Sequence, residues 1–255
     1  MKLIYLFIFF VLGCFFGSFF TVVGLRLPKH QDFIKKRSHC DVCEHDLSFL
    51  DMIPIISYLL LKGRCRYCHA KISNTSTYME LFTGILFALS YSIFGFSIEL
   101  LYALGIVGLL VILSVSDIAY YIIPDELLIF FGGYFLVLNV ISKGLMGAIY
   151  SLGSAVLLFL FMYSIMLLGN FFFKKETLGG GDIKLMLVVG LVLSPFLGMV
   201  MVFFASFLAL PVSLLILWKR GTNLIPFGPF LLISFMFLYF TQLDLSTILG
   251  WLKLF

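Results

Sequence analysis

The stretch that decides the fold is "LIYLFIFFVLGCFFGSFFTVVGL", residues 3–25, which contains no charged side chain. A transmembrane helix needs about 20 consecutive apolar residues, so this stretch is long enough to cross a bilayer. It is too long for the apolar core of a cleaved signal peptide, and no small-residue cleavage site closes it. We therefore expect it to be retained as the first transmembrane helix.

The rest of the chain has the same character. Of its 255 residues, 62% are hydrophobic and 12% are charged, and the mean hydropathy is +1.14. These values exclude an ordinary soluble globular domain. The sequence predicts an all-α integral membrane protein with about eight transmembrane helices, of which the sixth is short, tilted or half-embedded. The apolar blocks lie at residues 3–25, 79–96, 100–116, 126–142, 145–173, 183–195, 196–218 and 222–240.

The distribution of Lys and Arg predicts the orientation. If the amino terminus lies outside, 14 of the 17 Lys and Arg residues fall in segments on the cytoplasmic side. Cytoplasmic loops carry the excess of positive charge in membrane proteins. We therefore expect a multi-pass protein of the plasma membrane with both termini outside. The net charge of +4 reflects this topology and does not indicate binding to nucleic acid.

The expected organisation has three parts: a first helix at residues 1–25, a cytoplasmic segment at 26–77 and a membrane domain at 78–255. The cytoplasmic segment contains two C-x-x-C pairs, "CDVC" and "CRYC", about twenty residues apart. This spacing predicts four thiolates around one structural zinc ion. Two disulfides or metal-free thiols are the alternative, and a cytoplasmic location disfavours disulfides. The expected ligands are Cys40, Cys43, Cys65 and Cys68.

The cytoplasmic segment is also small. About fifty residues bury too little surface to be stable alone, so the metal is expected to supply much of the folding energy. Its apolar stretch at residues 53–61 is too short to cross a bilayer, and we expect it on the membrane surface or against the helices. Three histidines adjoin the Cys pairs and are alternative ligands, although surface side chains are the simpler interpretation: His39, His45 and His69.

Two aspartates are expected at the same membrane face. Asp117 follows the third apolar block in "SVSDIAYYIIPDE", and Asp182 begins the sixth in "ETLGGGDIKL". With the predicted topology both lie on the cytoplasmic side. Ionisable groups at membrane depth are energetically costly and usually functional. Two carboxylates that share a proton can activate water and protonate a peptide carbonyl, so Asp117 and Asp182 are candidate catalytic residues of an aspartic protease.

The glycines before Asp182 fit this chemistry. Residues without a β-carbon permit unusual backbone angles and let an extended substrate strand approach the main chain. The structural alternative is that Asp182 caps its helix. Capping does not explain Asp117, because a negative charge at a helix carboxyl end is unfavourable. The glycines are Gly179, Gly180 and Gly181.

Two further carboxylates have ordinary structural explanations. Asp125 follows Pro124 at the expected start of the fourth helix, which is a common position for a cap or turn. It ranks below Asp117 as a catalytic candidate. Glu80 completes "TYME", which has the form of a capping box, so a structural role stands beside a functional one.

Several segments together resemble the bacterial type IV prepilin leader peptidases, a family of membrane aspartic proteases. The resemblance spans nearly the whole chain and implies that Asp117 and Asp182 are the catalytic pair, with Asp182 in a Gly-x-Gly-Asp motif. It implies precursors of pilins and pseudopilins as substrates. The matching segments are "GSFFTVVGLRLP" (17–28), the two Cys pairs, "IPIISYLLLKGRCRYC" (53–68), "SDIAYYIIPD" (116–125), "GGGDIKL" (179–185) and "IPFGPFL" (225–231).

The resemblance also implies a second activity. Many members of the family methylate the new amino terminus with S-adenosylmethionine, a role associated with the cytoplasmic segment. Glu80 matches the acidic residue that follows this segment in the family. The sequence departs from the family at Thr21, where Asn is usual, and at Met79, where Pro is usual. Both positions lie near the segment credited with methylation and away from the aspartates.

Two other functions were weighed against a prepilin peptidase with N-methyltransferase activity. An intramembrane protease of the presenilin or signal-peptide-peptidase kind shares the Gly-x-Gly-Asp element, but the Cys segment argues against it. An ion-coupled transporter could use Asp117 and Asp182 to carry protons or cations, yet the sequence lacks paired interrupted helices. The expected partners are prepilin and pseudopilin precursors and membrane lipid, without nucleic acid, and a dimer is left open.

Overall fold

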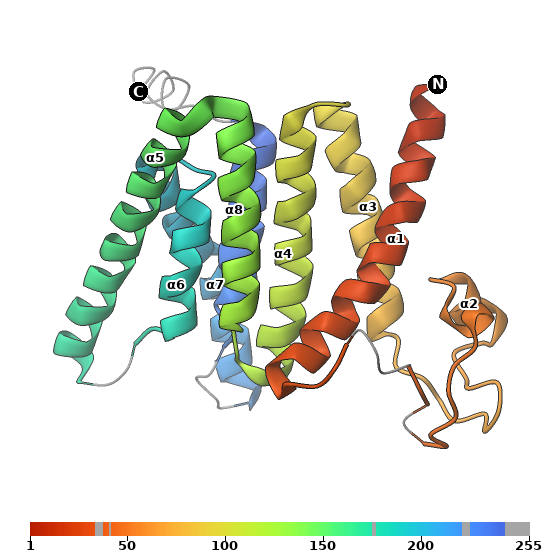
Figure 1. Ribbon diagram of the computed structural model, residues 1–255. Coiled ribbons are helices and arrows are strands. Elements are labelled where there is room, and N and C mark those ends of the chain that lie inside the picture. The colour runs from red at the N-terminus through yellow and green to blue at the C-terminus, as the bar shows by residue number, and fades with distance from the viewer. Residues whose placement is uncertain (34–37, 41, 175–176, 221–224, 243–255) are drawn as a thin grey trace. The chain divides into compact units, whose positions relative to one another are not determined.

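The computed structural model describes residues 1–33, 38–40, 42–174, 177–220 and 225–242 (Figure 1). Within these ranges the regular elements are helices, apart from two isolated β-bridges, which confirms the all-α prediction. The α-helices are α1 (Lys2–Arg26), α2 (Ile56–Leu60), α3 (Thr75–Phe94), α4 (Ile98–Tyr120), α5 (Asp125–Phe173), α6 (Gly180–Gly190), α7 (Pro195–Arg220) and α8 (Gly228–Thr241), and the 3-10 turns are η1 (Leu27–Lys29) and η2 (Phe49–Met52).

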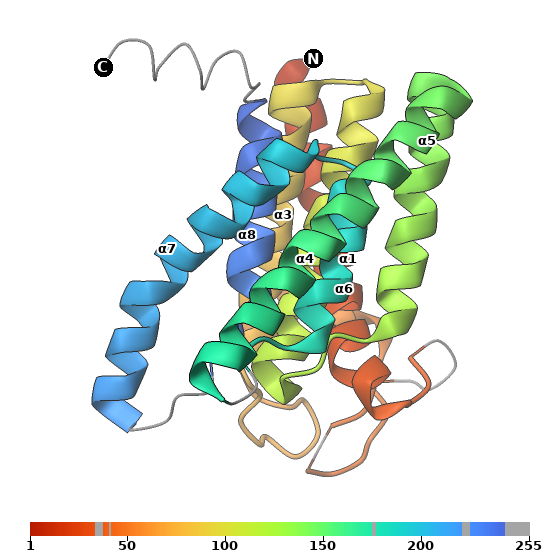
Figure 2. The ribbon, with the colours of Figure 1, turned by 90° about the vertical axis from the view of Figure 1, so that its left-hand side faces the viewer.

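Five of the described helices are long and apolar enough to cross a membrane, namely α1, α3, α4, α5 and α7. Helix α5 has 49 residues, and Gly144, with φ 71° and ψ −177°, interrupts it. Figures 1 and 2 show that α5 reverses direction, so it forms two antiparallel arms. These arms are the predicted blocks at residues 126–142 and 145–173. The chain is therefore a multi-pass membrane protein.

The two short helices differ from a complete span. Helix α6 has 11 residues and α8 has 14, fewer than the roughly 20 needed to cross a bilayer. Helix α6 ends at Gly190, five residues before the predicted end at Pro195. The predicted start of the eighth block, residues 222–224, lies outside the described residues. Each predicted block nevertheless corresponds to a helix or to one arm of α5.

The chain forms two compact units, Met1–Leu100 and Leu101–Phe255. In the first unit, α1 and α3 pack through small residues. A β-carbon on Gly13 would lie 2.8 Å from Gly84 Cα, and one on Gly17 would lie 2.9 Å from Glu80 Cα. Such small-residue contacts are typical of closely packed membrane helices. They place the face of α1 that contains Gly17 directly on Glu80.

In the second unit, polar side chains link α4 to α5 and to the end of α6. The Tyr102 hydroxyl donates to Asn139 Oδ1 at 3.0 Å, and Asn139 Nδ2 donates to the Leu191 carbonyl at 2.7 Å. Polar groups within a bilayer must find partners inside the protein. Asn139 therefore satisfies a carbonyl that the early end of α6 leaves without a helical partner.

Candidate functional site

Asp117 lies in the last turn of α4, and its side chain is buried, with 6% of the residue exposed. Its Oδ2 accepts a hydrogen bond of 3.1 Å from the backbone N–H of Gly228, the first residue of α8. The neighbouring Ser116 hydroxyl donates to the Ile122 carbonyl in the connection that follows α4. These bonds fix the carboxylate between the end of α4 and the start of α8.

Asp182 lies in the first turn of α6, and 8% of the residue is exposed. The residue before α6 is Gly179, and no side chain caps this helix by a hydrogen bond. The Oδ1 atom of Asp182 is buried without a hydrogen-bond partner among the described residues. Helix capping therefore does not account for Asp182. A buried carboxylate oxygen without a structural partner is energetically costly, and such atoms often have a chemical role.

The structure brings Asp117 and Asp182 together in the second unit, close enough for their charges to interact. The side chain of Ile123 lies beside both helix starts. A β-carbon on Gly181 would lie 2.8 Å from Ile123 Cβ, and one on Gly228 would lie 3.4 Å from Ile123 Cδ1. Ile123 thus packs between the starts of α6 and α8. Two buried carboxylates so placed are able to share one proton.

The three glycines before Asp182 contribute space and not unusual backbone angles. Gly179 has an extended backbone, with φ −69° and ψ 137°, and the other two are helical. The expectation of special angles was therefore wrong. A β-carbon on Gly181 would collide with Ile123, and one on Gly179 would lie 3.3 Å from Asp182 Oδ2, whereas Gly180 faces open space. The surface beside Asp182 is therefore open at Gly180.

Asp125 occupies a different environment from the buried pair. The Lys184 Nζ atom lies 2.8 Å from Asp125 Oδ1 and 2.7 Å from Oδ2, and both side chains are more than half exposed. This ion pair links the start of α5 to the first turns of α6. Exposed ion pairs contribute about 0–1 kcal/mol to stability. Asp125 is therefore exposed and paired, unlike the buried Asp117.

The four cysteines of the two C-x-x-C pairs form a second candidate site, in the first unit. Their Sγ atoms all lie within 4.8 Å of one another, and the Cys40 and Cys68 sulfurs are 3.8 Å apart. Four sulfurs bound tetrahedrally at about 2.3 Å from zinc would be about 3.8 Å apart. The cysteines are not joined by disulfides, and none of the neighbouring histidines belongs to the cluster. The donor set therefore fits a metal ion.

The two Cys pairs have the same backbone structure. In each, the N–H of the first Cys donates to the carbonyl five residues later, and the N–H four residues later donates back to the first Cys. Glu44 and His69, each four residues after the first Cys of its pair, have φ of 56° and 57°. The bonds are Cys40 N–H to His45 O (3.0 Å), Glu44 N–H to Cys40 O (2.8 Å), Cys65 N–H to Ala70 O (2.9 Å) and His69 N–H to Cys65 O (3.1 Å).

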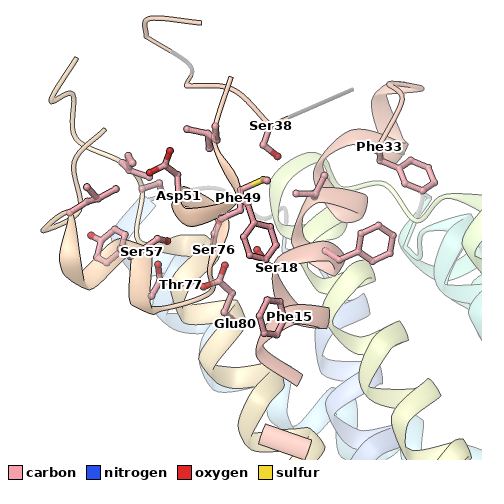
Figure 3. Close-up of a pocket in the computed structure, with 18 of the residues that line it drawn as sticks. Phe15, Ser18, Phe33, Ser38, Phe49, Asp51, Ser57, Ser76, Thr77 and Glu80 are labelled. Atoms are coloured by element: carbon pink, nitrogen blue, oxygen red, sulfur yellow. The ribbon is translucent and has the colours of Figure 1, made fainter. Parts of the chain in front are cut away.

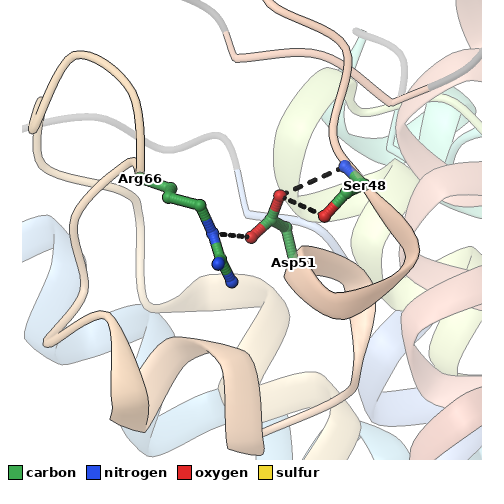
Figure 4. A network of polar contacts seen from close by, with 3 residues as sticks. All are labelled: Ser48, Asp51 and Arg66. Atoms are coloured by element: carbon green, nitrogen blue, oxygen red, sulfur yellow. Dashed lines mark hydrogen bonds and ion pairs between the residues drawn. The ribbon is translucent and has the colours of Figure 1, made fainter.

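Asp51 connects the second Cys pair to the η2 turn (Figure 4). Its Oδ1 accepts from Arg66 Nε at 2.6 Å, and its Oδ2 accepts from the Ser48 hydroxyl at 2.6 Å and from the Ser48 N–H at 3.1 Å. Burial acts to raise the pKa of Asp51, but these hydrogen bonds outweigh burial and hold the pKa below its ordinary value. Asp51 therefore remains ionised beside Arg66 at neutral pH.

Glu80 does not close a capping box. Helix α3 begins at Thr75, so Glu80 lies in its second turn and is too far from the helix start to pair with Thr77. Its Oε2 instead accepts a 2.8 Å hydrogen bond from the N–H of Ile55, which lies 25 residues earlier in the chain. Only 7% of Glu80 is exposed. The capping explanation suggested by "TYME" was therefore wrong.

Sequence reasoning missed two contacts of these sites. The N–H of Gly228 donates a hydrogen bond to Asp117. The segment "IPFGPFL" contains Gly228, but the resemblance gave this segment no structural role. The N–H of Ile55 donates a hydrogen bond to Glu80, and no local sequence pattern indicates this contact. Both contacts join residues that are distant in the chain.

Comparisons with known proteins group these sites with two families. Residues 11–94 match the bacterial peptidase A24 N-terminal domain, and residues 104–214 match the type IV leader peptidase family. The first region contains the four cysteines and Glu80, and the second contains Asp117 and Asp182. No solved structure matches the chain significantly.

Several curated relatives carry the same name, prepilin leader peptidase/N-methyltransferase. The chain is 38% identical to that of Bacillus subtilis, with 73% of each chain covered. It is 35% identical to that of Myxococcus xanthus, over 83% of this chain and 63% of the relative. It is 29% identical to that of Vibrio cholerae, over 94% of this chain and 98% of the relative.

Proposed function

Because the chain belongs to the type IV leader peptidase family, we propose that Asp117 and Asp182 are the catalytic pair of its membrane aspartic endopeptidase activity. The observation that carries this assignment is the burial of two carboxylates side by side in the region that matches the peptidase family. The proposed reaction removes the leader from type IV prepilins and pseudopilins, and methylation of the new amino terminus follows.

In the proposed mechanism the two carboxylates hold one proton between them. The ionised carboxylate takes a proton from water as the water oxygen attacks the scissile carbonyl, and the protonated carboxylate donates its proton to the carbonyl oxygen. The tetrahedral intermediate then collapses, and the leaving nitrogen takes a proton. The Gly228 N–H keeps Asp117 in place for this exchange.

The open surface at Gly180 supports the proposed substrate. An extended peptide can lie along this backbone beside Asp182 because no side chain occupies the space. The substrate is a precursor with a short basic leader in the cytoplasm and a hydrophobic helix in the membrane. The excess of Lys and Arg in alternate connections supports an active site on the cytoplasmic side with both termini outside. The scissile bond would therefore meet the aspartates at the membrane surface.

The cytoplasmic segment is proposed to hold one structural zinc ion through Cys40, Cys43, Cys65 and Cys68. The sulfur spacing and the paired backbone turns support this metal. Zinc bound by these four thiolates would hold the two Cys pairs together. S-adenosylmethionine is the proposed co-substrate of the methylation, because it supplies the methyl group that an amine accepts.

Gly228→Ala tests the contact that holds Asp117. A β-carbon at this position would lie 2.8 Å from Asp117 Oδ2, so the carboxylate must move. A displacement of about 1 Å can lower a catalytic rate about a hundredfold, and we expect a loss of that order in leader removal. The measurement is the initial rate of prepilin cleavage by purified enzyme in nanodiscs. Gly133→Ala is the matched control, since a β-carbon there meets no atom within 4 Å.

Asp125→Asn and Lys184→Met test the ion pair outside the buried site. Both side chains are exposed, so removing their attraction should change the cleavage rate less than about fivefold. The same initial-rate assay measures the effect. A loss as large as that of Asp117→Asn would transfer the catalytic assignment to Asp125.

The position of the cut distinguishes a prepilin peptidase from an intramembrane protease. Mass spectrometry of the cleaved prepilin should place the cut at the junction between leader and hydrophobic helix. A cut within the helix would instead favour an intramembrane protease of the presenilin kind. Uptake of protons or cations by vesicles containing the purified protein, lost in both aspartate variants, would favour transport.

A further inference from the structure

Helix α2 presents an apolar face that the first unit leaves uncovered. Ile56, Leu59 and Leu60 have the i, i+3, i+4 spacing of one helix face, and each is more than half exposed. None of these three residues lines the cavity of about 460 Å³ beside α2, whereas the polar residues Asp51 and Ser57 do (Figure 3). An uncovered apolar face of this kind marks an interaction surface.

The packing of α1 on α3 gives a depth scale for this unit. Both helices are long and apolar enough to cross a membrane, and Gly13 packs against Gly84 near the middle of each. This contact therefore marks the region of the bilayer centre. Glu80 lies four residues before Gly84, a distance of about 6 Å along the helix. Since the hydrocarbon core is about 30 Å thick, Glu80 lies about 9 Å inside its boundary.

The turn before α2 is held at this depth. The Ile55 N–H donates to Glu80 Oε2 at 2.8 Å, and a Glu side chain with one such bond spans less than the distance from Glu80 to the hydrocarbon boundary. Ile55 has φ 63° and ψ −50°, and the chain turns there between η2 and α2. Phe15, close to the middle of α1, lines the same cavity as Met52 and Tyr58. The turn therefore lies at membrane depth.

The backbone of this turn already has hydrogen-bond partners within the protein. Inside a bilayer, backbone N–H groups must find such partners because no water is available. Besides the Ile55 bond, four N–H groups of the turn and α2 donate to nearby carbonyls: Ile56 to Pro54, Ser57 to Ile53, Leu59 to Ile55 and Leu61 to Ser57. The turn can therefore contact acyl chains at little cost in hydrogen bonds.

Cations follow the apolar stretch directly. Lys62, Arg64 and Arg66 are all exposed, and the second Cys pair begins among them. Lys and Arg near membrane-embedded segments contact the phosphate groups of anionic lipids at the membrane surface. The order of apolar stretch, cations and Cys pair fits a chain that returns from lipid to water.

We propose that residues 49–61 form a re-entrant hairpin in the membrane, and that Ile56, Leu59 and Leu60 contact the acyl chains of the leaflet at the C-terminal end of α1. The partner of this surface is the lipid bilayer, which continues from the lipid-facing sides of α1 and α3. The hairpin anchors the segment at residues 26–77 in lipid, while its Cys pairs remain in water. This surface goes beyond the proposed peptidase and methylation activities and does not depend on them.

The test uses a single tryptophan as a reporter in the full, metal-loaded chain. Trp218 and Trp251 are replaced with Phe, and Ile56→Trp or Leu60→Trp is added. The chain is placed in nanodiscs of phosphatidylcholine and phosphatidylglycerol, with or without bromine near the middle of the acyl chains. Both reporters should emit at short wavelength and lose most of their fluorescence to the brominated lipid. Iodide in the water should leave their emission unchanged.

Val42→Trp is the matched control, because Val42 is a comparably exposed apolar residue of the same unit that lies between two Cys ligands. Iodide should quench this reporter, and brominated lipid should not. Zinc content and thermal unfolding show whether each variant is folded. Quenching of folded Ile56→Trp and Leu60→Trp by iodide alone would overturn the proposal, because the face would then lie in water. Protection from both quenchers would also overturn it, since another protein chain would then cover the face.

A second measurement requires no substitution. A carbene probe dissolved among the acyl chains labels residues that contact lipid, and mass spectrometry locates the labels on the wild-type chain. Residues 49–61 should be labelled together with α1 and α3, and residues 42–48 should not. Labels on α1 and α3 without any on residues 49–61 would contradict the re-entrant hairpin.

Discussion

Asp117→Asn and Asp182→Asn should each lower the rate of leader removal at least about a thousandfold. An amide has nearly the shape of a carboxylate, but it neither accepts a proton from water nor shares one with its neighbour. Because the two residues act as a unit, the double variant should be no slower than the slower single variant. Initial rates with a purified prepilin in nanodiscs measure both effects.

Two controls show whether the loss of activity is specific to the two aspartates and whether the variants are folded. Asp125→Asn removes an exposed carboxylate near the same helix starts and should keep most of the activity. Thermal unfolding of both aspartate variants should match or exceed that of the wild type, since each substitution replaces one carboxyl group of a buried pair that carries a negative charge with a neutral amide of nearly the same shape. A folded variant that retained more than about a tenth of the activity would show that its aspartate is not catalytic.

Removal of the metal is expected to have the second large effect. Few of the described side chains within residues 26–77 are buried, and structural zinc contributes about 10–16 kcal/mol of binding energy to small zinc domains. Chelation, or Cys65→Ser at a buried ligand position, should unfold the segment and abolish methylation. Leader removal should persist, because Asp117 and Asp182 belong to the other unit.

Metal analysis and limited trypsin digestion measure this prediction. The wild-type chain should contain one zinc ion, and Cys65→Ser none, with new trypsin cuts within residues 26–77. Cys14→Ala is the matched control, because this buried cysteine lies outside the cluster and should leave zinc content unchanged. Full methylation by a metal-free chain would contradict a structural role for the ion, and iron in place of zinc would contradict the metal assignment.

The helices were largely predictable because length and hydrophobicity alone determine most of them. The interruption of α5 was visible as Lys143 and Gly144 between two apolar blocks, and Gly144 supplies the positive φ there. The end of α6 was not predictable in the same way. At this end the side chain of Asn139 in α5 donates to the Leu191 carbonyl. No hydrophobic pattern encodes that contact.

In the candidate sites too, local sequence signals were predictable and contacts between distant residues were not. The spacing of the cysteines and the matching depths of Asp117 and Asp182 are local or periodic signals, and the sequence therefore indicated them. The partner of Asp117 is Gly228, which lies 111 residues away. The capping alternative for Glu80 was wrong because "TYME" fits a capping box only locally, whereas α3 begins at Thr75 and the carboxylate accepts from Ile55.

The most direct test of the catalytic pair is the intact mass of a tagged prepilin co-expressed with the wild-type chain, Asp117→Asn or Asp182→Asn. With the wild type, the pilin should lose its leader and gain the mass of one methyl group. With either variant, the full-length precursor should accumulate. Leader-free pilin produced by either variant, at a level comparable with the wild type, would contradict the assignment of Asp117 and Asp182 as the catalytic pair.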